Sequence, residues 1–220
     1  MTFYIENAID NHSLLAIQES ISDKSLFSDG NSTAGKSAGQ VKYNLQANSL
    51  AQSIVGVTKL IEDSLLKHEL VKSVAYPKRF AKTMISRYEQ NMHYGEHIDE
   101  AFINNARTDL AFTLFISEPN SYDGGELEIT KSDGRDTIKL PAGSAYIYPA
   151  NTIHQVLPVT KGVRLAAVGW IQSRVRCQHQ REILFDLTSA IAQIANTEQQ
   201  RTARLGLLKT RSNLERLWCD

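Results

Sequence analysis

Residues 145–171, AYIYPANTIHQVLPVTKGVRLAAVGWI, indicate the fold of the chain most clearly. It opens with a short apolar and aromatic run, Ala145 to Tyr148, which ends in a turn at Pro149 to Thr152. A second run, Arg164 to Ile171, is apolar after its first residue. Short runs of this kind, separated by turn residues, are typical of β-strands. We therefore predict two strands here, with His154 between them.

The same strand-like pattern extends over the middle of the chain, from Ala81 to Gln172. Large apolar residues occupy every second position from Leu110 to Ile116, which is the spacing of side chains on one face of a strand. Turn signals at Asp123-Gly124-Gly125 and at Asp133-Gly134 separate further short runs. Many short strands at this spacing predict a sandwich or a barrel.

Helical periodicity precedes this region. A short strand at Phe3 to Ile5 and a helix at Asn11 to Ser20 are expected first. The segment from Ser28 to Gln40 is rich in glycine and serine and is predicted to be a loop. A longer helix is expected between Leu50 and His68, because apolar residues recur there at helical spacing. The predicted apolar stripe consists of Leu50, Ile54, Val57, Leu60, Ile61 and Leu65.

The helical period returns after Arg181. Leu184 to Ile194 fits one helix, and Leu207 to Leu217 fits a second. Helices therefore flank a central β unit at both ends, which predicts an α+β fold with a mainly β core. The C-terminal pair of helices could pack on the β unit or form a dimer contact, and the pattern fits both arrangements.

The composition narrows the classes of function. Lys and Arg number 24, as do Asp and Glu, so the formal net charge is zero. Nothing in that balance predicts a nucleic acid or a membrane surface as partner. The two cysteines, Cys177 and Cys219, form no metal-binding pair, and the first residues contain no apolar signal core. We expect a soluble, cytoplasmic protein.

Three residues predict a metal site. His97 and Asp99 are two positions apart in a predicted strand, so an imidazole and a carboxylate would point to the same face. His154 is the best candidate for a third ligand. Two histidines and one carboxylate on one side of iron(II) leave positions open for other ligands, as non-haem oxygenases require. The alternatives are a surface His–Asp pair and a core histidine bonded to a backbone carbonyl.

Arg164 is the second signal, because it opens an otherwise apolar strand ten residues after His154. A buried guanidinium needs an anionic partner, and a carboxylate matches it in a two-pronged geometry. One candidate is the distal carboxylate of 2-oxoglutarate, whose keto-acid end would chelate the iron. The alternative is a structural ion pair with Glu126 or Asp109.

Several aromatic and imidazole side chains near these positions can be interpreted in two ways, as ligand contacts or as packing and surface residues. Tyr94, Tyr146 and Tyr148 could touch a cosubstrate or substrate, although packing is the commoner role of such residues. His93 is expected to line the pocket or to lie on the surface. Trp170 shares its strand face with Arg164, and core packing is the favoured interpretation.

The sequence resembles the PKHD-type hydroxylases, a branch of the prolyl-4-hydroxylase-like iron(II)/2-oxoglutarate oxygenases. The resemblance is good from Ala81 to Arg181 and less distinct over the first seventy-odd residues. The matching stretches are Arg87-Tyr88, Tyr94 to Asp99, Arg107 to Leu110, Tyr122 to Leu127, Lys139 to Gly143, Tyr148-Pro149, His154, Pro158 to Arg164 and Trp170 to Ser173.

The resemblance implies a distorted double-stranded β-helix, which is a jelly-roll or cupin-like barrel. It implies that His97, Asp99 and His154 bind Fe(II) and that Arg164 binds 2-oxoglutarate. Tyr88 matches a tyrosine that lies beside 2-oxoglutarate in related prolyl hydroxylases. The implied activity is that of a dioxygenase that hydroxylates an unactivated C–H bond with O₂ and converts 2-oxoglutarate to succinate and CO₂. The likeness also allows for L-ascorbate as a cofactor.

The expected organisation has three parts. Residues 1–80 support the barrel, residues 81–174 form the jelly-roll core, and residues 175–220 form a C-terminal helical extension. Two rival functions remain open at this point: a cupin-like metalloenzyme without 2-oxoglutarate, and a ligand-binding module without turnover. No motif names the substrate, which could be a small molecule or a peptide, and a homodimer is allowed.

Overall fold

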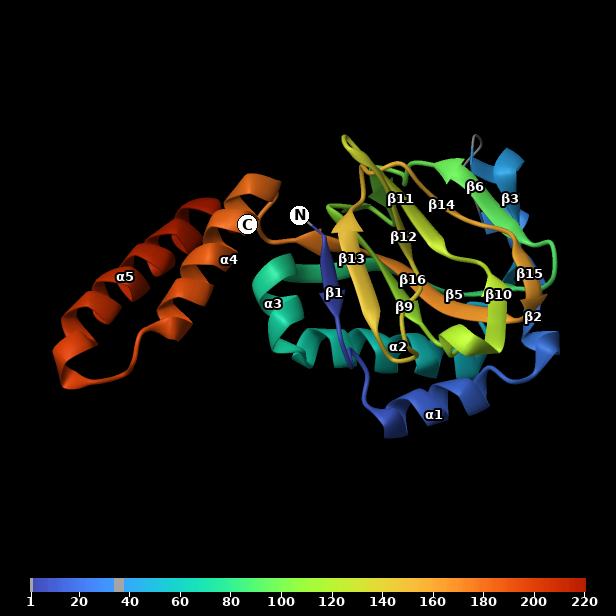
Figure 1. Ribbon diagram of the computed structural model, residues 1–220, viewed down its shortest axis with the longest axis horizontal. Helices are drawn as coiled ribbons and strands as arrows, with labels where there is room; N and C mark the ends of the chain where they lie inside the picture. Colours follow the sequence, from blue (N-terminus) through green and yellow to red (C-terminus); the bar gives the residue numbers. More distant parts are fainter. Residues whose placement is uncertain (1, 34–37) are drawn as a thin grey trace.

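The computed structural model describes residues 2–33 and 38–220. Its core is a β structure with helices against one outer face and a helical hairpin at the C-terminal end (Figure 1). The larger of two main sheets has seven antiparallel strands in the order β1-β13-β9-β16-β5-β4-β2. They are β1 (Phe3–Ile5), β13 (Ala145–Pro149), β9 (Leu110–Phe115), β16 (Arg164–Ser173), β5 (Pro77–Tyr88), β4 (Leu45–Ala47) and β2 (Phe27–Asp29).

The smaller sheet has five antiparallel strands in the order β12-β11-β14-β6-β3. They are β12 (Gly134–Ile138), β11 (Leu127–Lys131), β14 (His154–Val156), β6 (His93–His97) and β3 (Lys42–Tyr43). Two separate pairs join β7 (Phe102–Ile103) to β8 (Ala106–Arg107) and β10 (Tyr122–Gly124) to β15 (Val159–Gly162).

The path of the chain explains the barrel. From β5 onward the chain passes to the smaller sheet for β6, returns for β9, leaves for β11 and β12, and returns for β13. It then passes to the smaller sheet for β14 and returns to the larger sheet for β16, the last strand of the barrel. This winding between two sheets forms the distorted double-stranded β-helix that was expected.

Strand β9 shows why the barrel can hold a cavity. All six of its residues are buried, because both of its faces are covered. Phe112 and Leu114 pack into the apolar cluster shared with the helices, whereas Ala111 and Phe115 pack against the smaller sheet. The predicted alternation therefore separates an outer core beneath the helices from the inside of the barrel.

The outer core is formed by helices that lie along the larger sheet (Figure 1). They are α1 (Asn11–Ser20), α2 (Gln52–Lys67) and α3 (Glu69–Ala75). The apolar stripe of α2 is buried at Ile54, Val57, Ile61 and Leu65, as predicted. The prediction was wrong for Leu50, which precedes the helix and is 88% exposed.

The loop predicted from Ser28 to Gln40 begins in the last residues of β2. Two short 3-10 turns follow, Gly30–Thr33 and Ala38–Val41, and residues 34–37 lie outside the described residues.

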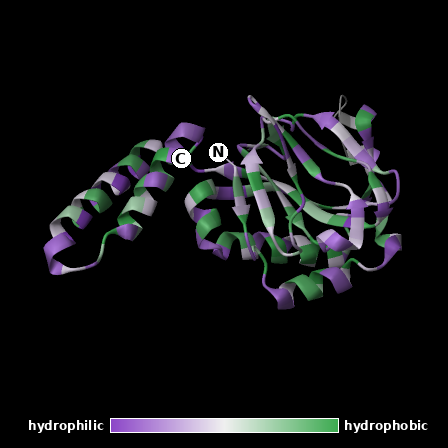
Figure 2. Cartoon of the chain, in the orientation of Figure 1, coloured by the Kyte–Doolittle hydropathy of each residue, from purple (hydrophilic) through white to green (hydrophobic). Residues whose placement is uncertain are grey.

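The C-terminal helices form a hairpin that projects from the side of the barrel (Figure 1). They are α4 (Gln178–Gln193) and α5 (Arg201–Trp218). Helix α4 is attached to the barrel, because the ring of Phe185 meets Phe3 of β1 edge-on at 5.3 Å. Helix α5 has no buried residue, and hydrophobic and hydrophilic residues alternate along it (Figure 2). In the described part of the chain, no helix combines the length and apolar character needed to cross a membrane.

A matched pair of leucine substitutions tests the packing of α2. Leu65→Ala should lower the free energy of unfolding by about 2–5 kcal/mol, because Leu65 is fully buried and truncation leaves a cavity. Leu50→Ala should change it by less than about 0.5 kcal/mol, because that side chain already faces solvent. Urea denaturation of both variants measures the difference, and equal losses would contradict the placement of the helix.

Candidate active site

Two neighbouring strands of the smaller sheet bring the predicted metal ligands together. His97 is the last residue of β6, and His154 is the first residue of β14, and the two lie opposite each other in the antiparallel register. Asp99 was predicted within the strand, but the strand ends at His97 and Asp99 lies in the segment that leaves the sheet. One potential ligand atom from each residue nevertheless lies within 4.8 Å of the others.

Backbone carbonyl groups fix the orientation of both imidazoles. Nδ1 of His97 lies 2.8 Å from the carbonyl oxygen of Gly95, and Nδ1 of His154 lies 2.9 Å from that of Thr152. A carbonyl oxygen can only accept, so each Nδ1 carries the proton and donates it. Each Nε2 is then left as a lone pair, which is the form that binds a metal.

Burial also sets the charges of the site. Burial, with a smaller contribution from the neighbouring His154, lowers the pKa of His97 to about 3. Burial raises the pKa of Asp99, and this rise is opposed by His154 and by the side chain of Trp170. Oδ2 of Asp99 is buried and has no hydrogen-bond partner in the described part of the chain, and Oδ1 lies 3.8 Å from Nε2 of His154.

This donor set fits a divalent transition metal. Two neutral imidazoles and one carboxylate match the two-histidine, one-carboxylate arrangement of non-haem iron(II). A cation bound there would also satisfy the buried oxygen of Asp99, which otherwise carries a desolvation cost.

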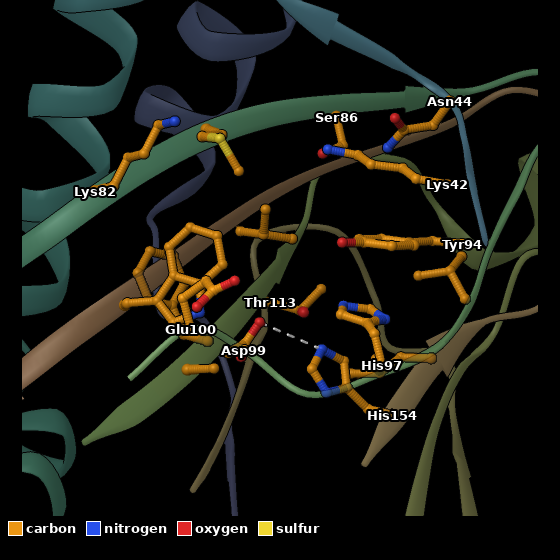
Figure 3. A pocket seen from close by; sticks show the side chains of 18 of the residues that line it. Lys42, Asn44, Lys82, Ser86, Tyr94, His97, Asp99, Glu100, Thr113 and His154 are labelled. Carbon is orange, nitrogen blue, oxygen red and sulfur yellow. Dashed lines mark ion pairs between the residues drawn. The ribbon is translucent and has the colours of Figure 1, made fainter. Parts of the chain in front are cut away.

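The three side chains line a cavity of about 150 Å³ inside the barrel (Figure 3). Two tyrosines on its wall hold the imidazoles in place. The ring of Tyr94 stacks on His97 with 3.7 Å between centroids, and Tyr148 meets His154 edge-on at 5.1 Å. Tyr146, in contrast, packs in the apolar cluster next to the smaller sheet.

Arg164 is buried beside this cavity and is only 1% exposed. Its guanidinium lies over the rings of Tyr88 and Phe115, at 5.1 and 5.6 Å from their centroids. None of its three nitrogens has a hydrogen-bond partner among the described residues. The hydroxyl of Tyr122 is also buried without one, and the charge of Arg164 opposes the rise that burial imposes on the pKa of Tyr122.

The two structural partners considered for Arg164 are engaged elsewhere. Asp109 accepts from Nε of Arg107 at 2.6 Å and from the backbone N–H of Ser173 at 2.8 Å. Glu126 lies 3.8 Å from Nζ of Lys139. A buried, always charged guanidinium without a protein anion is costly, which makes it a candidate for binding an anionic ligand.

One side of the cavity was not predicted from the sequence. Lys42, Asn44 and Gln46 line it from β3, β4 and the residue between them. Their polar side chains alternate with Tyr43 and Leu45, which was the available signal.

The structure also shows where Trp170 and His93 lie relative to the cavity. Trp170, favoured as core packing, packs against the inner cluster and also lines the cavity. His93 does not line it: its ring lies edge-on to Tyr43 at 6.1 Å, and Nδ1 is 3.2 Å from the carbonyl oxygen of Asn91.

Comparison with known proteins identifies the family. Residues 83–172 match the 2OG-Fe(II) oxygenase superfamily. A PKHD-type hydroxylase of Maricaulis maris is 46% identical over 195 residues, which cover 88% of each chain. The chain belongs to the PKHD-type hydroxylases. A PKHD-type hydroxylase of Gloeothece citriformis is 41% identical over the whole of both chains.

Solved structures agree with the fold of a PKHD-type hydroxylase. A prolyl-4-hydroxylase of Pseudomonas putida superposes with a TM-score of 0.56 at 18% identity, over 79% of this chain and 92% of the other. A prolyl hydroxylase of Trichoplax adhaerens, in complex with a hypoxia inducible factor peptide fragment, gives 0.59 at 12% identity over 78% and 83%. Similarities this distant show the fold alone.

Family membership confirms the predicted class of activity. The protein is an oxidoreductase, a dioxygenase that uses Fe(II), 2-oxoglutarate and O₂. Members of this family act on small-molecule or peptide substrates. The two rival functions, which lack 2-oxoglutarate turnover, are disfavoured accordingly.

The lowered pKa of His97 predicts how the metal-free protein responds to acid. Between the ordinary pKa of 6.5 and about 3, the unfolded state binds a proton at this histidine that the folded state does not. The free energy of unfolding should therefore fall as pH decreases through that range. The raised pKa of Asp99 acts in the opposite direction above 3.8.

Denaturation in the presence of a chelator, from pH 6.5 to 4, measures this dependence. His97→Gln removes the titrating group and should flatten the fall relative to the unmodified protein. An equally steep fall in both proteins would show that other groups cause it.

Proposed function

We propose that this PKHD-type hydroxylase holds iron(II) through Nε2 of His97, a carboxylate oxygen of Asp99 and Nε2 of His154. The observation that carries the proposal is the convergence of these ligand atoms within 4.8 Å on the wall of the cavity. The carbonyl groups that hold each Nδ1 support it further, because they leave the ligand nitrogens unprotonated.

Arg164 is the proposed anchor for the distal carboxylate of 2-oxoglutarate. Its buried nitrogens have no other partner in residues 2–33 and 38–220, and the Tyr122 hydroxyl beside it supplies a further donor. Tyr88 lies opposite Arg164 in the register of β5 and β16, and its ring forms the floor beneath the guanidinium. This contact supports the role proposed for Tyr88 beside the cosubstrate.

The bound iron and 2-oxoglutarate supply the oxidising chemistry that hydroxylates a C–H bond and releases succinate and CO₂. The protein supplies position and shielding. Tyr94 and Tyr148 hold the imidazoles, and the carbonyl groups behind them keep the metal-binding nitrogens unprotonated. Apolar side chains of the cavity wall, among them Leu127, Val156 and Val168, exclude water from the reacting groups.

Further expectations concern the partner, the cellular compartment, the oligomeric state and a possible cofactor of the protein. The zero net charge favours a small molecule or peptide over a nucleic acid or membrane surface as partner. The two free cysteines are compatible with the cytoplasm. The exposed apolar residues of α5, Leu205 and Leu217, would suit a homodimer contact through the hairpin. A need for L-ascorbate stays a prediction.

Removal of one ligand tests the metal assignment. His97→Ala and Asp99→Ala should each abolish stoichiometric iron(II) binding, because two remaining ligands hold the ion too weakly. Anaerobic titration with iron(II), followed by metal analysis, measures the stoichiometry, and circular dichroism checks the fold. Tyr146→Phe, a change in the apolar cluster, serves as a control that should bind one equivalent. Unchanged iron content in the alanine variants would refute the assignment.

Replacement of Arg164 tests the cosubstrate anchor. Arg164→Met keeps much of the side-chain volume but removes the charge. It should lower the affinity for 2-oxoglutarate by about 10- to 100-fold, which corresponds to about 1.5–3 kcal/mol of binding free energy. Anaerobic titration of the iron-loaded protein, followed through its visible charge-transfer absorption, measures this affinity. Arg201→Met on the exposed helix α5 should leave it unchanged. Normal 2-oxoglutarate affinity in Arg164→Met would move the anchor elsewhere.

A further inference from the structure

A group of buried polar residues lines the cavity away from the metal ligands. We call Lys42, Asn44, Gln46 and Ser86 the polar wall. These four side chains are only 1–7% exposed. Figure 3 shows Lys42, Asn44 and Ser86 gathered on one side of the cavity, across from Asp99 and His154. Neither the iron site nor the Arg164 pocket uses them.

Strand pairing places the polar wall at this position. Lys42 lies opposite Tyr94 in the pairing of β3 with β6, and Gln46 lies opposite Ser86 in the pairing of β4 with β5. Nζ of Lys42 lies 5.3 Å from the centroid of the Tyr94 ring, and that ring stacks on His97. One aromatic ring therefore separates the positive charge of the wall from a proposed metal ligand.

Asn44 is the residue of the polar wall that most clearly indicates a ligand-binding site. It is 2% exposed, and within residues 2–33 and 38–220 neither its amide nitrogen nor its amide oxygen has a hydrogen-bond partner. The side chain lies near Tyr88, without the geometry of a hydrogen bond. It also fills the space next to Gly30, where an added Cβ would come 2.1 Å from its oxygen. Buried amides in native proteins are nearly always satisfied, so this one is a candidate for ligand binding.

The neighbours of Asn44 favour an anionic ligand with acceptor oxygens. Nζ of Lys42 donates to Oε1 of Gln46 at 3.1 Å and brings a positive charge into the wall. Ser86 accepts from Nε2 of Gln46 at 3.4 Å, so its own hydroxyl proton can point to a ligand. Lys82 adds a second positive charge nearby, and Asp29 offsets part of it.

This combination suits a carboxylate. With the charge of Lys82 partly offset by Asp29, the ammonium of Lys42 beside neutral amide and hydroxyl donors suits one negative charge and offers several donors to two oxygens. The cosubstrate does not need these donors, because its keto-acid end is assigned to the metal and its distal carboxylate to Arg164. The wall is therefore available to the primary substrate.

We propose that Lys42, Asn44 and Ser86 bind a carboxylate of the primary substrate, on a small molecule or at the C-terminus of a peptide. The proposal rests on the proposed function, because it assumes that the cavity beside the metal ligands is the reaction site. The carboxylate would fix one end of the substrate at the wall. The C–H bond to be hydroxylated would then face the triad across the cavity.

Paired probes test the charge preference directly. The protein is loaded with zinc(II), a non-reacting substitute for iron, and with 2-oxoglutarate. Calorimetry then gives dissociation constants for N-acetyl-alanine, N-acetyl-leucine and N-acetyl-proline, each compared with its primary amide. A peptide, acetyl-Ala-Ala-Leu, compared with its C-terminal amide, distinguishes a peptide terminus from a small molecule. For at least one pair, the carboxylate should bind at least about tenfold more tightly than the amide.

Two substitutions in the wall should change this preference. Lys42→Met removes the charge at similar length and should bring the two members of a pair to within about twofold. Asn44→Asp is isosteric but places a negative charge beside the ligand, and should make the carboxylate the weaker binder. Lys209→Met, on exposed helix α5, is the matched control and should keep the preference of the unmodified protein.

Three results would overturn the proposal. The first is equal binding of carboxylates and amides, or no binding of any carboxylate, in the unmodified protein. The second is a preference that survives Lys42→Met. The third is a loss of 2-oxoglutarate affinity in Lys42→Met as large as in Arg164→Met, which would assign the wall to the cosubstrate. Metal and 2-oxoglutarate binding are measured first on every variant, so failure of the proposed function is seen separately.

Discussion

The antiparallel pairing of β6 with β14 is the constraint on which the rest of the site depends. It places His97 opposite His154, so two imidazoles from positions 57 residues apart face one cavity. Each ring is then held by the carbonyl group two residues before it, at 2.8 and 2.9 Å. Because both orientations come from the backbone, the site is formed before any metal arrives, and little ordering remains to oppose binding.

The interior of the barrel carries charged groups that the described residues do not neutralise. The guanidinium of Arg164 lies over two aromatic rings and has no anionic partner among these residues, and one buried oxygen of Asp99 has no donor among them. Each would be unfavourable alone, because an unpaired charge in a low-dielectric interior is costly. The signs are complementary to a cation at Asp99 and to an anionic cosubstrate at Arg164. Binding of such ligands at these residues would offset that cost.

Much of this arrangement could be predicted from the sequence, and the failures have physical causes. Strand β9 was predicted correctly because large apolar residues recur at every second position from Leu110 to Ile116. The three predicted metal ligands stood out because His97 and Asp99 are two positions apart and His154 offers a third ligand, and Arg164 stood out because it opens an apolar strand. Asp99 was misplaced in a strand because nothing in its neighbours marks where the pairing of β6 ends. The segment containing Lys42 was missed because its alternation of polar and apolar residues spans only two short strands of two and three residues, which is too short a pattern to stand out.

The cavity residues that were predicted from the sequence and those that were missed have different proposed roles. The superfamily match spans residues 83–172, and the triad, Arg164 and Tyr88 all lie inside it. Lys42, Asn44 and Gln46 lie outside it, on the edge strand β3 of the smaller sheet, on β4, which is next to the edge of the larger sheet, and on the residue between them. Oxidation by iron and 2-oxoglutarate needs the same geometry for every substrate, whereas recognition must differ. Short strands at or near the sheet edges can change their side chains without disturbing the central pairing, and this makes them a natural place for substrate recognition.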